Sequence, residues 1–233
     1  MPRRAAWVSA LLAMATLAGG ASAEQIVWKF DNLKRIGGLT PTLEGRPRLV
    51  DSPVGKAVQF DGHSALFFPE RPLVGAKTFS IEVIFRPEGG AFQQRWLHIA
   101  EVDPVTGRDS DPPGGKPDPN PRFMYELRVV GNQWYADAYV TSKGGSRTLS
   151  FPEQLHAINQ WHAVEQTYDG TTYRSYVNGV LQGEGEVGFV PQGSGHVMVG
   201  SRLNHVDYFQ GSIALARFTD RALRPEEFLQ LPR

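Results

Sequence analysis

The alternation of apolar and polar residues along this chain is the feature that most constrains its fold. In the segment 79–85 the residues that point one way are all apolar: Phe79, Ile81, Val83 and Phe85. The segment 123–129 repeats the pattern. A period of two is typical of a β-strand that buries one face, and helical periodicity is almost absent after the first residues. The pattern predicts an all-β fold, a two-sheet antiparallel β-sandwich in which 79–86 is a half-buried strand.

Turn residues divide the chain into short strands. Gly131-Asn132 forms a two-residue turn between the segments 123–130 and 134–140, which predicts a β-hairpin. A second hairpin is expected from 162–168 and 173–177, joined by 169–172 and followed by a tight turn at 178–179. Helix is expected only at 225–229, where a proline precedes two acids. The sandwich is therefore predicted to end in a short helix.

The first 23 residues resemble a secretory signal peptide. Arg3 and Arg4 precede an apolar stretch at 5–17, and Ala21-Ser22-Ala23 supplies the small residues that signal peptidase requires. The apolar run is shorter than the roughly 20 residues of a bilayer span, which argues against a membrane anchor. The arginine pair also leaves a twin-arginine route open. We predict cleavage after Ala23, one domain over 24–233, and a periplasmic or extracellular location.

Composition excludes several function classes. The sequence holds 24 basic and 24 acidic residues, and loss of the two leader arginines leaves a slight negative charge. No basic patch is visible for nucleic acid or an anionic membrane, so neither is expected as a partner. The chain has no cysteine, which excludes disulfides, thiol nucleophiles and cysteine-bound zinc. The six histidines lack the spacing of a metal site.

One segment, 103–121, is too rich in proline, glycine and aspartate to be a central strand. We expect a long loop there. Its aspartates supply the hard oxygen ligands that calcium prefers, with a solvated acidic loop as the alternative. The candidate calcium ligands, without an EF-hand spacing, are Asp103, Asp109, Asp111 and Asp118.

Several motifs, in order, resemble the laminin-G-like branch of the concanavalin A-like jelly rolls. They include 55–62, ending in Phe-Asp-Gly, and the Trp-His, Tyr-Asp-Gly and Tyr-Val-Asn-Gly motifs at 161–162, 168–170 and 176–179. The resemblance implies a jelly roll and often a structural calcium ion. Many members carry acids where this chain has Ser212 and Ala214, so a role for those acids is not carried over. The scaffold hosts lectins, glycosidases, lyases and adhesion modules, so fold alone does not give function.

The first hairpin predicts a polar surface. Counting back from its turn places Arg128 opposite Tyr135. It also places Glu126 opposite Asp137, on the side away from the apolar residues. Aromatic rings stack on sugars, and charged groups form paired hydrogen bonds with adjacent hydroxyls.

In the second hairpin the same counting places Glu165 beside Tyr176 and puts Arg174 on a polar side. If the two hairpins adjoin, both polar sides form one concave surface. A carbohydrate-binding module is therefore the leading hypothesis. Its predicted ligand-binding residues are Glu126, Arg128, Tyr135, Asp137, Tyr139, Glu165, Arg174 and Tyr176.

Other functions stay open. The same surface could bind a protein or be an ordinary solvated face. Two carboxylates about 5 Å apart, at Glu126 and Asp137, match a retaining glycosidase, although Arg128 could neutralise them. The fragments 126–128 and 154–156 are similar to parts of alginate-lyase-like jelly rolls, but the later motif is missing. We assign no catalytic residue and no certain cofactor, and we expect no enzyme.

Overall fold

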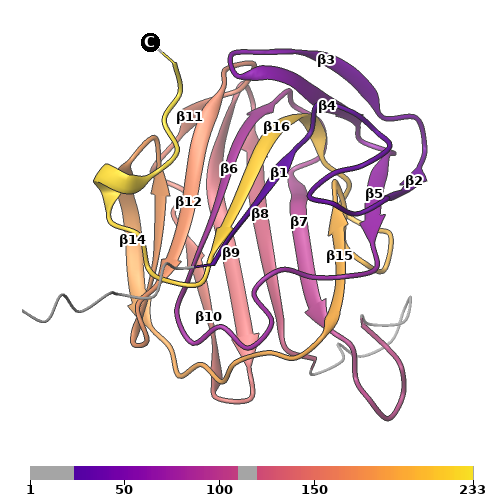
Figure 1. The fold of residues 1–233 in the computed structure, drawn as a ribbon. Coiled ribbons are helices and arrows are strands. Elements are labelled where there is room, and N and C mark those ends of the chain that lie inside the picture. The colour runs from indigo at the N-terminus through magenta and orange to yellow at the C-terminus, as the bar shows by residue number, and fades with distance from the viewer. Residues whose placement is uncertain (1–23, 110–119, 233) are drawn as a thin grey trace, which may run out of the picture.

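The computed structural model describes residues 24–109 and 120–232, which form a sandwich of two antiparallel sheets with eight strands each (Figure 1). The predicted fold class is confirmed. The first 23 residues, for which a signal peptide is predicted, lie outside the described residues. Within the described ranges, no helix is long and apolar enough to cross a membrane.

The front sheet of Figure 1 has the strand order β14-β13-β12-β6-β16-β4-β3, with β1 pairing on β16. Its strands are β1 (Gln25–Lys29), β3 (Arg48–Ser52), β4 (Gly55–Asp61), β6 (Phe79–Pro87), β12 (His162–Tyr168), β13 (Thr172–Val177), β14 (Val180–Glu186) and β16 (Gln210–Thr219).

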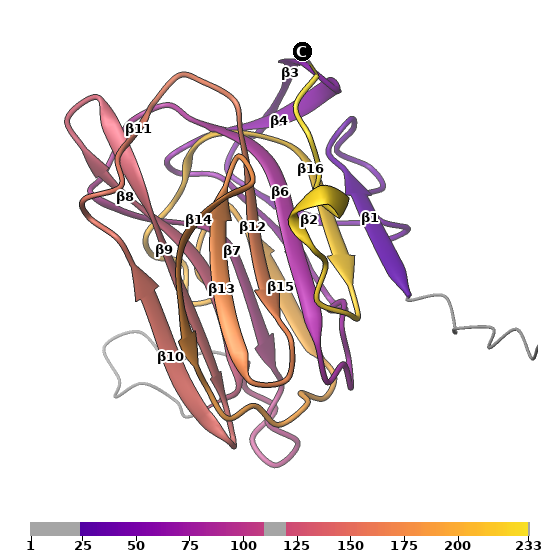
Figure 2. The same cartoon turned by 90° about the vertical axis from the view of Figure 1, so that its left-hand side faces the viewer.

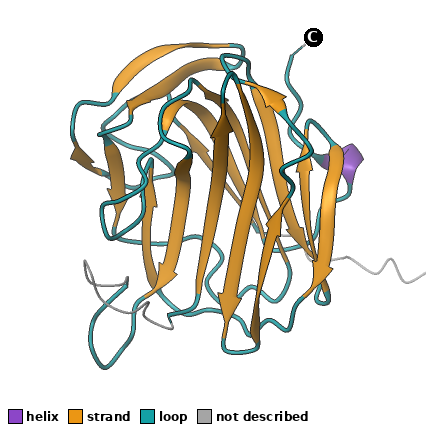
Figure 3. Ribbon diagram, turned by 180° about the vertical axis from the view of Figure 1, so that it is seen from behind, coloured by secondary structure: helices purple, strands orange, loops and turns teal. Residues whose placement is uncertain are grey.

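The rear sheet has the order β10-β9-β8-β7-β15-β5-β2, with β11 pairing on β9, and faces the reader in Figure 3. Its strands are β2 (Thr42–Glu44), β5 (Ala65–Phe68), β7 (Gln93–Glu101), β8 (Arg122–Val130), β9 (Gln133–Ser142), β10 (Gly145–Ser150), β11 (His156–Ala157) and β15 (Gly195–Val199).

The core fills the space between the two sheets, seen edge-on in Figure 2. The apolar residues predicted to share one side of 79–85 and of 123–129 all point into it. Phe79 on β6 meets Phe123 on β8 edge-to-face at 4.9 Å between ring centroids. Alternation therefore did predict which side of each strand faces inward, because the core is filled mainly by apolar and aromatic side chains.

Both predicted hairpins form with the predicted registers. Arg128 pairs with Tyr135 across β8 and β9, and Tyr168 pairs with Tyr173 across β12 and β13. The turn from β13 to β14 needs positive φ at two positions, and Asn178 (52°) with Gly179 (76°) supplies them. The registers follow from turn chemistry alone, which is why the sequence predicts them.

The C-terminal segment differs from the prediction. The helix expected over 225–229 is a single 3-10 turn, η1 (Pro225–Glu227), because Phe228 returns to extended backbone. The segment then crosses the outer face of the front sheet, where Phe228 packs on Tyr176 at 5.0 Å between centroids. It also covers β6, so Ser80 and Glu82 are buried. The expectation that 79–86 is only half-buried was wrong.

Candidate functional site

The two predicted polar hairpins do not form one surface. β8 and β9 belong to the rear sheet, whereas β12 and β13 belong to the front sheet (Figures 1 and 3). The expectation of one concave face holding all eight residues was therefore wrong. A turn fixes which side chains of a hairpin share a side, but the neighbours of that hairpin depend on long-range strand order.

The three front-sheet residues have separate surroundings. Glu165 is 0% exposed, and Tyr176 is buried beneath Phe228. Arg174 stays at the surface and forms ion pairs with Asp169 and Glu184. The predicted ligand-binding role of Glu165 and Tyr176 does not fit this burial, because the C-terminal segment occupies the place a ligand would need.

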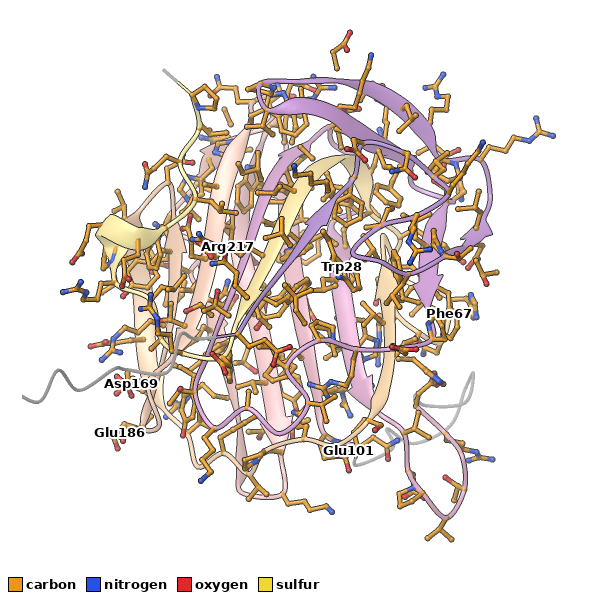
Figure 4. The ribbon with its side chains drawn as sticks, in the orientation of Figure 1. Trp28, Phe67, Glu101, Asp169, Glu186 and Arg217 are labelled. Atoms are coloured by element: carbon orange, nitrogen blue, oxygen red, sulfur yellow. The ribbon has the colours of Figure 1, made fainter. Side chains whose placement is uncertain are left out.

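Glu165 belongs to a buried acidic cluster. It lies beside Glu82 across β12 and β6, and the two oxygens of Glu82 accept hydrogen bonds from Nε and Nη2 of Arg217. Arg217 is labelled in Figure 4. Neither carboxyl oxygen of Glu165 has a hydrogen bond of regular geometry, although the backbone N–H of Gly179 is near. Burial, reinforced by the charge of Glu82, raises the pKa of Glu165 to about 9. Glu165 is therefore protonated in the folded protein at neutral pH.

The rear-sheet residues do come together, on the outer face. Arg128 Nη2 lies 2.8 Å from Glu126 Oε2 and 2.9 Å from Asp137 Oδ2, so one guanidinium group bridges both carboxylates. Arg95 on β7 binds the other oxygen of Glu126 at 2.8 Å, and its Nη1 lies 3.2 Å from Asp207. We call these five residues the rear-face network.

Burial is the largest influence on the carboxyl groups of the network. It raises the pKa of Glu126, opposed chiefly by the positive charge of Arg95. It also raises the pKa of Asp137, opposed chiefly by Arg128. Each guanidinium therefore compensates the desolvation of a neighbouring acid, and the network holds charged donors and acceptors in fixed positions.

An exposed aromatic ring lies beside the network. Phe92, in the turn between β6 and β7, is 56% exposed and lies 5.9 Å from the Arg128 guanidinium. Tyr135 is only 9% exposed, so it offers little open ring for stacking. Tyr139 is half-buried, with the Arg122 guanidinium 5.5 Å from its ring. The available stacking surface is thus Phe92 rather than Tyr135.

Sequence reasoning missed Phe92, Arg95 and Asp207. A register shift in β7 between Arg95 and Leu97 sets which side chain meets Glu126, and no turn next to β8 reveals it. Asp207 comes from a loop 70 residues further along the chain than Asp137. The sequence offered one signal, for Phe92 alone: an aromatic residue within the Gly-rich turn Gly89-Gly90-Ala91-Phe92 is expected to be exposed.

The fragments that are similar to a lyase lie on opposite sides of the rear sheet. Glu126 and Arg128 point outward, whereas His156 packs against the core residue Trp134 at 5.0 Å and binds Gln182. His162 is buried and binds the Ala157 carbonyl oxygen at 2.9 Å, as expected for a structural residue. These positions do not assemble a catalytic set.

The candidate calcium ligands are only partly described, since Asp111 and Asp118 lie outside the described residues. Asp103 accepts hydrogen bonds from the backbone N–H groups of Val105 and Thr106, which closes a local turn. Asp109 instead contacts His196 at 2.7 Å. Within the described ranges no cluster of three metal-ligating side chains occurs. Calcium binding stays a prediction.

The sequence was compared with protein-family models. The model described as the concanavalin A-like lectin/glucanases superfamily, Laminin_G_3, matches residues 60–228. The chain belongs to this superfamily. The matched region contains the motifs around β12 and β13 and the Phe-Asp-Gly end of the motif at 55–62, and the match confirms the resemblance drawn from the sequence. No curated protein sequence matches the chain.

Solved structures share the superfamily fold. Domain 4 of AbnA, an extracellular arabinanase from Geobacillus stearothermophilus in complex with arabinotriose, has a TM-score of 0.62 at 18% identity; the match covers 89% of this chain and 97% of that one. The binding domain of botulinum neurotoxin DC in complex with SialylT has a TM-score of 0.55 at 12% identity, over 87% of this chain and 49% of that one.

A further match is the NanB sialidase of Streptococcus pneumoniae, with a TM-score of 0.57 at 16% identity, covering 73% of this chain and 26% of that one. This chain thus spans about half of the neurotoxin structure and a quarter of the sialidase structure. At these identities the matches show the fold alone.

Proposed function

We propose that this protein is an exported, non-catalytic carbohydrate-binding module that binds its ligand on the outer face of the rear sheet. The observation that carries the proposal is the rear-face network beside the exposed ring of Phe92. Arg128 and Asp207 are the most exposed charged side chains of the network, at 14% and 25%, and can hydrogen-bond to adjacent sugar hydroxyls, while the buried acids hold them in place. The ring of Phe92 can cover the apolar face of a sugar. Arabinotriose in AbnA domain 4 and the sialyl ligand of the neurotoxin domain support a glycan as ligand.

The geometry of the acids supports a non-catalytic module. A retaining glycosidase needs its sugar ring between the two carboxylates. Here Arg128 Nη2 lies between Glu126 and Asp137, within 2.9 Å of both. The guanidinium group occupies the space where the reacting carbon would enter. Release of reducing ends from a polysaccharide panel, abolished by Glu126→Gln, would contradict this part of the proposal.

The proposed cleavage after Ala23 is supported by the contacts of the residues that follow it. Glu24, the first residue after the proposed cleavage site, already accepts a hydrogen bond from the Asp220 backbone N–H at 3.2 Å, and β1 starts at Gln25. We propose that the mature chain starts at Glu24 and is one domain. Mass spectrometry of the secreted protein should give the mass of a chain that starts at Glu24. Retention of the first 23 residues would refute cleavage.

Phe92→Ala tests the ligand-binding face. Phe92 is exposed, so its removal should leave the free energy of unfolding nearly unchanged. Affinity for the best oligosaccharide from a glycan array should fall about tenfold, or about 1.4 kcal/mol, by isothermal titration calorimetry. Val180→Ala, an exposed apolar change on the front sheet, is the matched control.

Arg128→Lys keeps the positive charge but loses the planar group that bridges two carboxylates. This variant should also lower the affinity for the oligosaccharide. Unchanged affinity in both Phe92→Ala and Arg128→Lys would move the ligand away from this face. If no glycan binds but a protein partner is captured on the same residues, the adhesion alternative replaces the carbohydrate proposal.

A further inference from the structure

A separate hollow opens on the same outer face of the rear sheet, at the edge formed by β2, β5 and β15. Its volume is about 520 Å³, which is in the range of small-molecule sites. The register places Thr42 beside Phe67 and Phe67 beside Met198, so these side chains share the outer face. The residues that line the hollow are Thr42, Leu43, Glu44, Phe67, Asp109, Met198, Leu203 and His205.

The floor of the hollow is apolar. Met198 and Leu203 are buried in a small cluster, against which the half-buried ring of Phe67 packs. Phe67 lies at the right-hand margin of the molecule in Figure 4, away from Arg217 on the front sheet. A floor of one ring and two aliphatic side chains suits the C–H face of a sugar ring.

The rim is polar and held in place. Glu44 accepts a hydrogen bond from the Tyr208 hydroxyl and contacts His205 Nδ1 at 2.7 Å. Asp109 contacts His196 at 2.7 Å. A carboxylate oxygen accepts more than one hydrogen bond, so both acids keep lone pairs for sugar hydroxyls. Because Glu44 and Asp109 line the hollow and would repel the carboxylate of an acidic sugar, a neutral sugar fits it better than an acidic one.

One loop, 200–209, connects the hollow with the rear-face network. It supplies Leu203 and His205 to the hollow and Asp207 to Arg95. His205 and Asp207 both have positive φ, 60° and 56°, a conformation that costs energy in residues other than glycine. The Leu203 backbone N–H binds His98 Nδ1 at 3.0 Å, which fixes the loop on β7. The two strained residues therefore lie in the loop that contributes side chains to both the hollow and the rear-face network.

We propose that this hollow is a second subsite, which binds one neutral glycosyl residue of the same glycan that the rear-face network binds. The inference rests on the proposed function. Two subsites on one face let a single chain bind at both, and the second contact then forms at high effective concentration. Loss of either subsite should weaken binding of a long oligosaccharide more than binding of a single sugar.

Titration of the full chain with neutral oligosaccharides tests the proposal, using arabinotriose, xylotetraose and cellotetraose as probes and trigalacturonate as the acidic comparison. In two-dimensional amide NMR spectra, a bound neutral probe should shift resonances of residues 42–44 and 203–205. Calorimetry should show at least a fivefold loss for Phe67→Leu, which keeps apolar volume and removes the ring. Glu44→Gln should give a similar loss and serves where Phe67→Leu fails to fold.

The outcomes separate the two proposals. If Phe92→Ala weakens binding while Phe67→Leu and Glu44→Gln bind as tightly as the wild type, the second subsite is refuted and the rear-face network stands. If neutral probes shift only residues around β8 and β9, or if only trigalacturonate binds, the second subsite is likewise refuted. If no glycan of any class binds, both proposals fall. Val180→Ala again controls for a general loss of affinity.

Discussion

Replacing Glu165 by glutamine should remove most of one source of pH dependence from the stability of this protein. Glu165 is 0% exposed and lies between Glu82, which forms a salt bridge with Arg217, and Tyr176; the C-terminal segment contacts both of these neighbours. Its folded-state pKa is about 9, against 4.5 for an exposed glutamate. Glutamine has nearly the shape of the protonated acid and cannot ionise, so the substitution changes the titration more than the packing.

The sign and size follow from linkage. Above pH 4.5 the unfolded chain loses the Glu165 proton while the folded protein keeps it, so rising pH favours the unfolded state until about pH 9. Each pH unit in this window costs about 1.4 kcal/mol. At pH 7 the wild type is therefore destabilised by about 3 kcal/mol relative to its state below pH 4.5. Glu165→Gln should be more stable than the wild type by that amount at pH 7 and equally stable at pH 4.5.

Urea unfolding followed by tryptophan fluorescence at pH 4.5, 6, 7 and 8 measures the difference between the two proteins. Other titrating groups are common to both and cancel in the comparison. Glu184→Gln, at an exposed carboxylate on β14 of the same sheet, is the matched control and should show no such pH-dependent gain. A difference between Glu165→Gln and wild type that does not change with pH, or a less stable variant at pH 7, would refute the assignment of Glu165 as a buried neutral acid.

Two further predictions concern packing. Phe228→Ala should lower the free energy of unfolding by about 3 kcal/mol because it empties a buried site over the front sheet. By admitting water to Glu165, it should also flatten the pH dependence of stability. A loss below about 1 kcal/mol in urea unfolding would mean that this ring does not hold the C-terminal segment. Gly195→Ala should prevent native pairing of β15 with β7, since the added methyl carbon would lie 1.9 Å from the Ala100 carbonyl oxygen; a variant with unchanged circular dichroism and urea midpoint would contradict this close approach.

Local patterns predicted the parts of the fold that local physics determines. Alternation placed Phe79 and Phe123 on inward faces, and turn residues fixed the pairing of Arg128 with Tyr135. Both depend only on residues within one strand or one hairpin. The ion pairs that Arg128 makes with Glu126 and Asp137 follow from the same register, so three of the five residues of the rear-face network were predictable.

The rest depends on contacts between distant segments. No local signal shows that β12 pairs with β6 and not with β8, so the two hairpins were placed together in error. The C-terminal residues that cover the outer face around Glu165 come more than 50 positions later in the chain. Alternation cannot distinguish a polar side chain that another segment covers from one that is exposed to solvent. Arg95 and Asp207 join the network through a register shift and a loop, which pattern reasoning does not reach.

The C-terminal segment makes the sandwich one-sided. Its apolar residues Leu229 and Leu231 pack beside Ile84 and Trp161, so the described chain ends on the outer face of the front sheet. The segment covers part of that face, and the opposite face carries both proposed binding sites. A tether, tag or further domain joined at the C-terminus would therefore attach at the edge of the sandwich where the described chain ends, at the top of Figure 1, and would not cover the rear face. A protein immobilised through its C-terminus on an array or sensor surface should therefore capture ligand most efficiently.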